Sequence, residues 1–236
     1  MPGEYPEPVR KPGTQGTQST GGGNSLQSAG RKDLAEGLRR RALFARTMLT
    51  HPRQVGAIWP TSRRAVNDLL DLADFGEART VVEFGTGTGV YTREVLARLR
   101  PDGRFLSFEL DADLASAVST RLADPRMRVI NDSAEHAGRY VEGEKADILV
   151  SSVPFTSLPP GLRDDIMQTA RDVLKPGGRM LVLQYSTAVL ADLKRFFGPV
   201  ERRISPVNLP PAFLFACDNP GRQDRQDGDL EEGNNS

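Results

Sequence analysis

The sequence predicts an α/β fold with a doubly wound, mostly parallel sheet of seven strands. The first observation behind this prediction is alternation: short β-branched and apolar runs are separated by longer segments of helical periodicity. The second is a strand, a glycine-rich turn and a helix in direct succession, which form the first half of a βαβ unit. The expected strands lie at residues 81–83, 104–110, 128–130, 146–150, 179–185, 200–204 and 212–217.

The chain divides into four segments of different composition. Residues 1–30 are rich in Gly, Pro, Ser, Thr and Gln, so we expect a disordered tail. Residues 31–50 are expected to form a basic amphipathic helix, and residues 218–236 an acidic disordered tail. The folded domain is expected over residues 51–217. Its helices are expected at 63–72, 90–100, 111–122, 134–140, 162–174 and 188–197.

Charge is unevenly distributed, although the whole chain has a formal net charge of zero. From Arg31 to Arg64 there are nine basic and two acidic residues, whereas the stretch from Asp218 onward has six acidic and two basic ones. The basic helix could lie on an anionic membrane surface with its apolar stripe in the acyl boundary, or it could cap the core. The single cysteine, Cys217, excludes a disulfide framework and a Cys-based zinc site, and no metal is expected.

Targeting signals are absent from the sequence pattern. No apolar run approaches the ~18–20 residues that a transmembrane helix needs, and the N-terminus lacks the apolar core of a secretory signal. The expected location is therefore cytoplasmic, with peripheral contact to the inner face of the cell membrane.

The stretch VVEFGTGTGVYT, residues 81–92, carries the strongest functional signal. Three alternating glycines follow its strand, at Gly85, Gly87 and Gly89. They let a ligand approach the backbone closely, but the dinucleotide fingerprint would need a glycine where Val90 stands. The carboxylate of Glu83 at the strand end suits a ligand with an ammonium group better than a pyrophosphate. The pattern E-x-G-x-G-x-G resembles the first motif of class I S-adenosylmethionine (SAM) methyltransferases, which implies that SAM is the cofactor.

The ends of the second and third strands offer polar groups for a nucleoside. Glu109 lies 20 residues beyond Gly89, a spacing that suits a carboxylate accepting both ribose hydroxyls. Asp132, just past the third strand, can accept a hydrogen bond from an adenine amino group, and the N–H of Ser133 can donate to the ring. Each carboxylate also has a simpler interpretation: Glu109 as a solvated strand end, and Asp132 as a helix N-cap.

A narrower resemblance covers roughly residues 51–217. It rests on the segments HPRQVGAIWPTS, DILVSSVPFTSLPPGLRDDIM, LVLQYST and NLPPA, read together with the glycine motif. These are similar to bacterial phospholipid N-methyltransferases, which are related to the rRNA adenine dimethylases. The resemblance implies methylation of the amine of a phospholipid substrate such as phosphatidylethanolamine, and binding of the basic helix to an anionic membrane surface. The final strand–turn–strand also looks like the antiparallel seventh strand of class I methyltransferases.

Other functions remain as alternatives. Adenine N6-methylases carry an Asn or Asp at the end of the fourth strand, and an aromatic residue there stacks on the flipped base. Here Ser151 or Ser152 occupies that place and Phe155 is the nearby aromatic residue, so the side-chain amide or carboxylate is missing. The acidic tail would also repel nucleic acid. RNA adenine or a small-molecule amine is the alternative acceptor, and a non-catalytic SAM-binding protein is the third hypothesis.

Catalysis is expected to depend chiefly on positioning, because no strong base stands in the expected place. An alkyl amine is mostly protonated at neutral pH, and desolvation would favour its neutral form. Tyr185, at the end of the fifth strand, and Ser152, at the strand end facing the donor, are the candidates for orienting the amine or the lipid phosphate. Tyr91 is a candidate contact to donor or head group. Arg163 could pair with the phosphate or lie on the surface.

Overall fold

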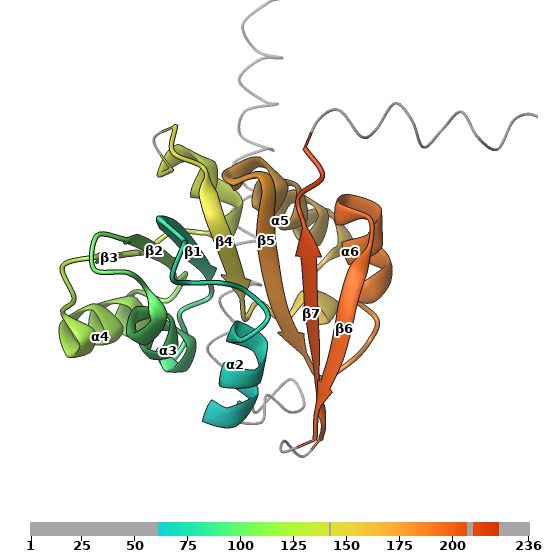
Figure 1. The fold of residues 1–236 in the computed structure, drawn as a ribbon, viewed down its shortest axis with the longest axis horizontal. Coiled ribbons are helices and arrows are strands. Elements are labelled where there is room, and N and C mark those ends of the chain that lie inside the picture. Colours follow the sequence, from blue (N-terminus) through green and yellow to red (C-terminus); the bar gives the residue numbers. More distant parts are fainter. Residues whose placement is uncertain (1–60, 142, 207–209, 222–236) are drawn as a thin grey trace, which may run out of the picture. The chain divides into compact units, whose positions relative to one another are not determined.

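The computed structural model describes residues 61–141, 143–206 and 210–221, and these form a seven-stranded sheet with helices (Figure 1). The strand order is β3-β2-β1-β4-β5-β7-β6. The pairs from β3 to β5 are parallel, and β7 is antiparallel to both β5 and β6, which confirms the predicted doubly wound, mostly parallel sheet. The strands are β1 (Thr80–Phe84), β2 (Arg104–Phe108), β3 (Met127–Ile130), β4 (Ala146–Ser151), β5 (Leu174–Gln184), β6 (Val200–Ser205) and β7 (Ala212–Asp218).

The helices begin where the sequence provides caps. Ser62 accepts a hydrogen bond from the N–H of Ala65 at 3.1 Å, and Asp111 caps the helix that follows β2. The expected helix over residues 31–50 lies outside the described residues. The described helices are α2 (Arg63–Leu70), α3 (Val90–Arg98), α4 (Ala112–Leu122), α5 (Pro160–Val173) and α6 (Leu190–Phe197), with two 3₁₀ helices, η1 (Ala134–Arg139) and η2 (Phe155–Ser157).

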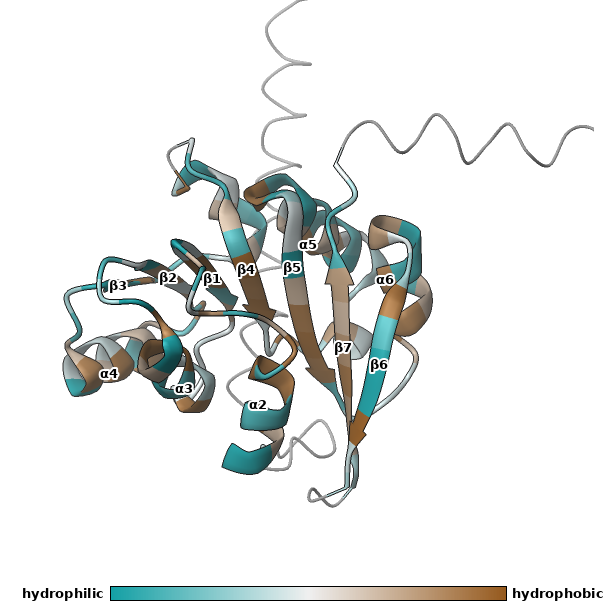
Figure 2. Cartoon of the chain, viewed as in Figure 1, coloured by the Kyte–Doolittle hydropathy of each residue, from teal (hydrophilic) through white to brown (hydrophobic). Residues whose placement is uncertain are grey.

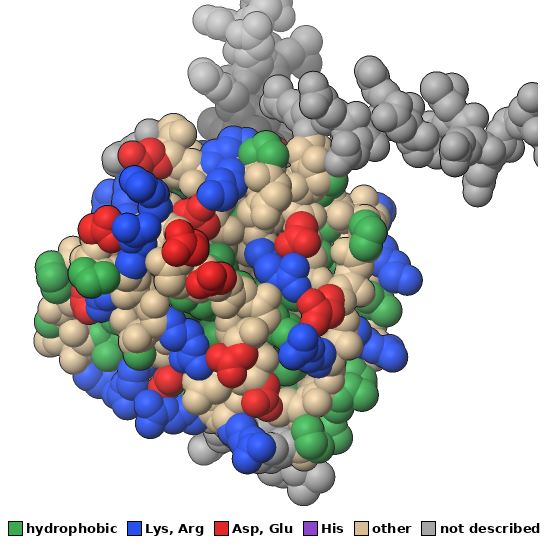
Figure 3. Space-filling model, in the orientation of Figure 1, with side chains coloured by type: hydrophobic (Ala, Val, Ile, Leu, Met, Phe, Trp, Pro, Cys, Tyr) green, Lys and Arg blue, Asp and Glu red, His purple; other side chains and the backbone are tan. Residues whose placement is uncertain are grey.

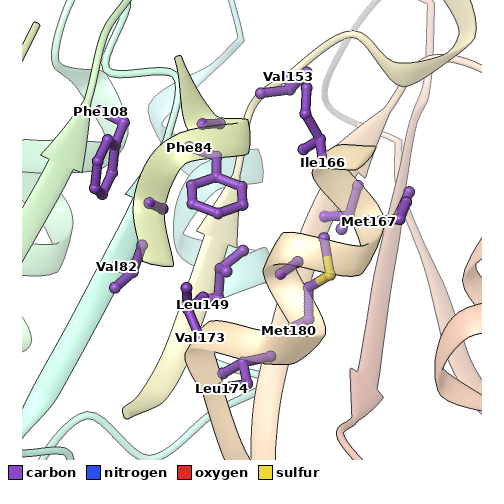
Figure 4. Close-up of a cluster of buried hydrophobic side chains, with 14 of the residues drawn as sticks. Val82, Phe84, Phe108, Leu149, Val153, Ile166, Met167, Val173, Leu174 and Met180 are labelled. Atoms are coloured by element: carbon purple, nitrogen blue, oxygen red, sulfur yellow. The ribbon is translucent and has the colours of Figure 1, made fainter. Parts of the chain in front are cut away.

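Successive strand residues face two different apolar layers, because side chains alternate along a strand. On one face, Val82, Phe84 and Leu149 are fully buried and pack in a cluster with Met167 and Val173 of α5 (Figure 4). The other face belongs to a second cluster, which includes Val81, Phe105 and Ile148 of the strands and side chains of α2 and α3. Coverage of both faces explains why most side chains of the inner strands are apolar.

The edge strand β6 differs from the inner strands in hydropathy. Figure 2 shows apolar colouring along β7 and the lower parts of β4 and β5, and a hydrophilic stretch in β6. That stretch is exposed and includes Glu201, Arg202 and Arg203. Charged side chains on an edge strand discourage pairing with another chain.

The Lys-Pro-Gly-Gly segment behaves differently from the simple turn that the sequence predicts. It lies within β5 as an irregularity, because two residues along β4 correspond to five along β5 between the pairs Ala146–Leu174 and Ile148–Arg179. The buried Asn219 holds this segment: its side-chain amide donates to the carbonyls of Arg171 and Leu174 at 3.0 and 2.9 Å. β7 therefore runs to Asp218, and the next residue, Asn219, packs against the start of β5.

Candidate active site

The carboxyl ends of β1 and β4 lie side by side in the sheet, at the point where its strand order changes direction. Beyond β1 lie β2 and β3, and beyond β4 lies β5. Open parallel sheets bind their ligands at such a switch point, outside the carboxyl ends of the strands. A hydrogen bond of 3.0 Å from the N–H of Ser152 to the carbonyl of Phe84 ties the two strand ends together.

The glycine turn depends on backbone conformations that other residues rarely adopt. Gly85, Gly87 and Gly89 have φ angles of 84°, 52° and 78°. At Gly85 an added Cβ would also lie 2.8 Å from the hydroxyl oxygen of Ser152. At Gly87 an added Cβ would meet no described atom within 4 Å. The backbone at Gly87 is therefore open to close approach by a ligand.

Glu109 lies directly beside this turn and is only 2% exposed, so it is not a solvated strand end. One carboxylate oxygen accepts a hydrogen bond from the N–H of Gly87 at 2.7 Å, and the other accepts from the N–H of Asp111 at 2.9 Å. A carboxylate has about four acceptor positions, so acceptor capacity for two hydroxyls remains. Acceptance of the ribose hydroxyls stays a prediction, but Glu109 clearly also holds the glycine turn in place.

Glu83 is buried at the end of β1. Its Oε2 accepts hydrogen bonds from the hydroxyls of Thr92 at 2.9 Å and Ser107 at 2.5 Å. Its Oε1 is buried and receives no hydrogen bond from any described residue. Burial raises the pKa of Glu83 to about 7; the two hydroxyls oppose this rise, and the charge of Glu109 adds to it. A carboxyl oxygen left without a donor in a buried place is suited to accept an ammonium group.

Asp132 is engaged by three internal donors. Its Oδ1 accepts from the N–H of Ser133 at 2.7 Å and lies 2.8 Å from Nδ1 of His136, while its Oδ2 accepts from the hydroxyl of Tyr140 at 2.7 Å. Burial opposes ionisation of Asp132, but these hydrogen bonds hold its pKa below the usual range. Its contact with an adenine amino group stays a prediction. If the N–H of Ser133 donated to the adenine ring, that hydrogen bond would have to replace its present one to Asp132. The N-cap of η1 is Ser133, so the simpler interpretation of Asp132 as the helix N-cap is wrong.

The three residues predicted to act on the acceptor have different surroundings. Ser152 donates its hydroxyl proton to the carbonyl of Gly85 at 2.6 Å, so its oxygen is left as an acceptor only. The hydroxyls of Tyr185 and Thr61 lie 3.1 Å apart. Tyr91 is 6% exposed; burial raises its pKa, and a hydrogen bond with Thr61 opposes that rise. Thr61 therefore connects the two tyrosines.

Sequence reasoning missed several polar residues of this region. Thr61 and Thr92 lie within the segments HPRQVGAIWPTS and VVEFGTGTGVYT, but nothing in their local pattern indicates a role. The available signal for Ser107 was a polar residue within an otherwise apolar strand. Arg163 lies in α5 and forms an ion pair with Asp192 at 3.2 Å. A role for Arg163 in binding a phosphate stays a prediction.

Residues 81–178 match the family model of a methyltransferase domain. The match contains the glycine turn, Glu109 and Asp132, and it ends within β5. Over 180 residues the chain is also 28% identical to an ornithine lipid N-methyltransferase of Singulisphaera acidiphila, an alignment that covers 74% of this chain and 94% of that protein. The chain is a SAM-dependent methyltransferase.

Two further comparisons place this methyltransferase among its relatives. It shares its fold with the crystal structure of the N-methyltransferase NodS from Bradyrhizobium japonicum in complex with S-adenosylhomocysteine, with a TM-score of 0.59 and 14% identity, covering 74% of this chain and 98% of that one. It is 27% identical to a ribosomal RNA small subunit methyltransferase A of Synechococcus over 136 residues, which is 57% of this chain and 48% of that protein.

The donor side of the methyltransferase site fits SAM on three observations: the open backbone at Gly87, the remaining acceptor positions of Glu109 and the unpartnered oxygen of Glu83. Bound there, SAM supplies an electrophilic methyl group on a sulfonium. The residues predicted to hold it are Glu83, Gly85, Gly87, Gly89, Glu109, Asp132, Ser133 and Ser152.

The described residues contain no group of three or more His, Cys, Asp and Glu side chains that could hold a metal ion. Within the same ranges, the methyltransferase has no helix with both the length and the apolar character needed to cross a membrane.

Proposed function

We propose that the protein transfers methyl groups to the amine of an amino lipid, such as phosphatidylethanolamine or an ornithine lipid, at a membrane surface. The observation that carries the proposal is the extent of similarity. The relative named as an ornithine lipid N-methyltransferase is aligned over 94% of its length, whereas the ribosomal RNA methyltransferase is aligned over 48%. The basic segment at residues 31–50 would attract anionic lipids, although it lies outside the described residues.

The geometry at the end of β4 favours a lipid over an RNA base. Stacking on a flipped adenine needs an accessible aromatic face. Phe155 follows β4 but is fully buried within the apolar cluster beside α5. Ser152 has no side-chain amide, and its hydroxyl already donates its proton to the carbonyl of Gly85. An aliphatic amine needs neither group, and hydroxyl oxygens such as those of Tyr185 and Thr61 suffice to orient it.

The amine must lose a proton before its lone pair can take the methyl group. That proton would pass to water. With SAM bound, the neutral nitrogen would then bond to the methyl carbon as the carbon–sulfur bond breaks, and the electrons of that bond would stay on sulfur. Burial keeps Tyr91 neutral by raising its pKa, so Tyr91 serves as a hydrogen-bond partner and not as a base. The chain's contribution is to hold the amine in line and away from water, which disfavours its protonated form.

The decisive experiment uses the purified full chain and SAM carrying a labelled methyl group. It is incubated with vesicles of phosphatidylethanolamine and anionic lipid, with vesicles containing ornithine lipid, and with ribosomal RNA. We expect label in a lipid extract, and none with a Glu109→Ala variant, which controls for label carried by other proteins. Label in RNA, or in no acceptor, would contradict the proposal.

Tyr185 provides a test of the acceptor side. Removing its hydroxyl in Tyr185→Phe should lower kcat for the lipid, because the amine loses an orienting partner, by about tenfold. The dissociation constant of SAM, measured by calorimetry, should stay unchanged. A variant with full activity would remove Tyr185 from the proposed site.

A further inference from the structure

A pocket opens beside the glycine turn, between the starts of α2 and α3 and the end of α4. Its volume is about 280 Å³, just below the ~300–1,000 Å³ of pockets that enclose drug-sized ligands. It is therefore large enough for a head group and too small for a whole lipid. Its lining consists of Thr61, Arg63, Thr88, Gly89, Val90, Arg93, Glu94 and Arg121.

The lining carries an excess of positive charge that is not internally neutralised. Arg63 pairs with Glu94 at 2.6 Å, and Glu94 also lies 3.6 Å from Arg98, so this carboxylate is fully engaged. Arg121 donates to the carbonyl of Thr88, which carries no formal charge. The side chain of Arg93 is exposed, and its guanidinium forms no hydrogen bond or ion pair with another residue of the described ranges. Figure 3 shows basic side chains along the lower left of the visible face, where α3 and α4 lie in Figure 1.

The pocket adjoins the site of methyl transfer on two sides. Thr88 and Gly89 belong to the glycine turn that is predicted to hold the donor. Thr61 lines the pocket and also contacts the hydroxyl of Tyr185, the predicted partner of the amine. A ligand that placed an anionic group in the pocket would therefore have its neighbouring atoms close to Tyr185 and the donor.

We infer that this pocket binds the oxyanion of the acceptor's head group, with Arg93 and Arg121 as its ligands. The inference rests on the proposed function and names the recognised chemistry: an amine separated by a few bonds from a phosphate or a carboxylate. Guanidinium groups bind both oxyanions through paired hydrogen bonds. Phosphatidylethanolamine would supply a phosphate and an ornithine lipid a carboxylate. Binding of the oxyanion fixes the distance of the amine from the methyl donor, so the pocket selects zwitterionic amino lipids over simple amines.

The test compares three variants of the full chain: Arg93→Glu, Arg93→Lys and, as a matched control, Arg79→Glu. Arg79 is exposed and directly precedes the amino end of β1, whereas the glycine turn follows the carboxyl end of the same strand. Each lipid is presented in neutral detergent micelles, so that attraction to an anionic surface does not contribute. The KM for each lipid and the dissociation constant of SAM are measured separately.

We expect Arg93→Glu to raise the lipid KM by about ten- to a hundredfold, since it loses charged hydrogen bonds. Arg93→Lys should recover much of the loss, and Arg79→Glu should match the wild type, with SAM affinity unchanged in all three. An effect on one lipid alone identifies phosphate or carboxylate as the bound group. An unchanged KM for both lipids, or a parallel loss of SAM affinity, overturns the inference while leaving lipid methylation intact. Failure of the wild type to methylate either lipid overturns the proposed function and this inference together.

Discussion

SAM affinity should depend on pH through Glu83, and this dependence gives a direct test of the donor site. The Glu83 carboxyl is buried, one of its oxygens receives no hydrogen bond from the described part of the chain, and burial raises its pKa to about 7. If the ammonium group of SAM contacts it, binding requires the ionised form. Lowering the pH through 7 then weakens binding, and SAM releases a proton from the protein when it binds.

The magnitude follows from the pKa. At about pH 6 roughly one Glu83 in ten is ionised, so the dissociation constant should rise about tenfold above its plateau, or ~1.4 kcal/mol. Between about pH 7 and about pH 6 the expected change is roughly five- to sixfold. This window lies below the usual α-amino pKa of about 7.7–8.0, so the ligand stays mostly protonated throughout.

Calorimetry in buffers of different ionisation enthalpy measures both the affinity and the released proton. The Glu83→Gln variant should bind SAM weakly with a flat pH profile. It should also be more stable than the ligand-free wild type above about pH 7. A carboxyl whose pKa is raised from 4.5 to about 7 on folding adds stability below 4.5 and loses it as the pH rises through 7. A wild-type affinity that is constant across the window, or a Glu83→Gln variant with the wild-type slope, would refute the assignment.

Three further predictions concern the glycine turn and the irregular start of β5. Glu109→Ala should abolish SAM binding in calorimetry while circular dichroism stays native; an unchanged affinity would exclude Glu109 from the donor site. In denaturant titrations, Gly85→Ala should lower the free energy of unfolding by about 2–4 kcal/mol, because the new Cβ would combine a positive φ with a close contact to Ser152. Gly138→Ala is the control: its Cβ would meet open space, so its free energy of unfolding should lie within about 1 kcal/mol of the wild type. In the same titrations, Asn219→Ala should lower the free energy of unfolding by about 1–3 kcal/mol, because it leaves buried carbonyls unpaired. The affinity for SAM should persist. A shift in SAM affinity without a loss of stability would contradict this purely structural role.

Local patterns were sufficient to predict most of the fold and the donor side of the site. Apolar strands alternate with helical periodicity, and parallel strands place their carboxyl ends at one edge, so Glu83, the glycine turn and Glu109 could be expected near each other. The structure bears this out through the hydrogen bond between Glu109 and Gly87. The irregular start of β5 was not predictable, because it depends on Asn219, which approaches from the far end of the domain.

The sequence by itself determined the order of elements, the glycine turn and the carboxylates at the strand ends, because each depends on spacing within a few residues. Only the tertiary structure decided which side chains share an environment. It buried Phe155, joined Thr61 to Tyr185, and brought arginines from different helices around one pocket. Burial and charge pairing arise from contacts between distant segments, and no local periodicity records which of those contacts will form.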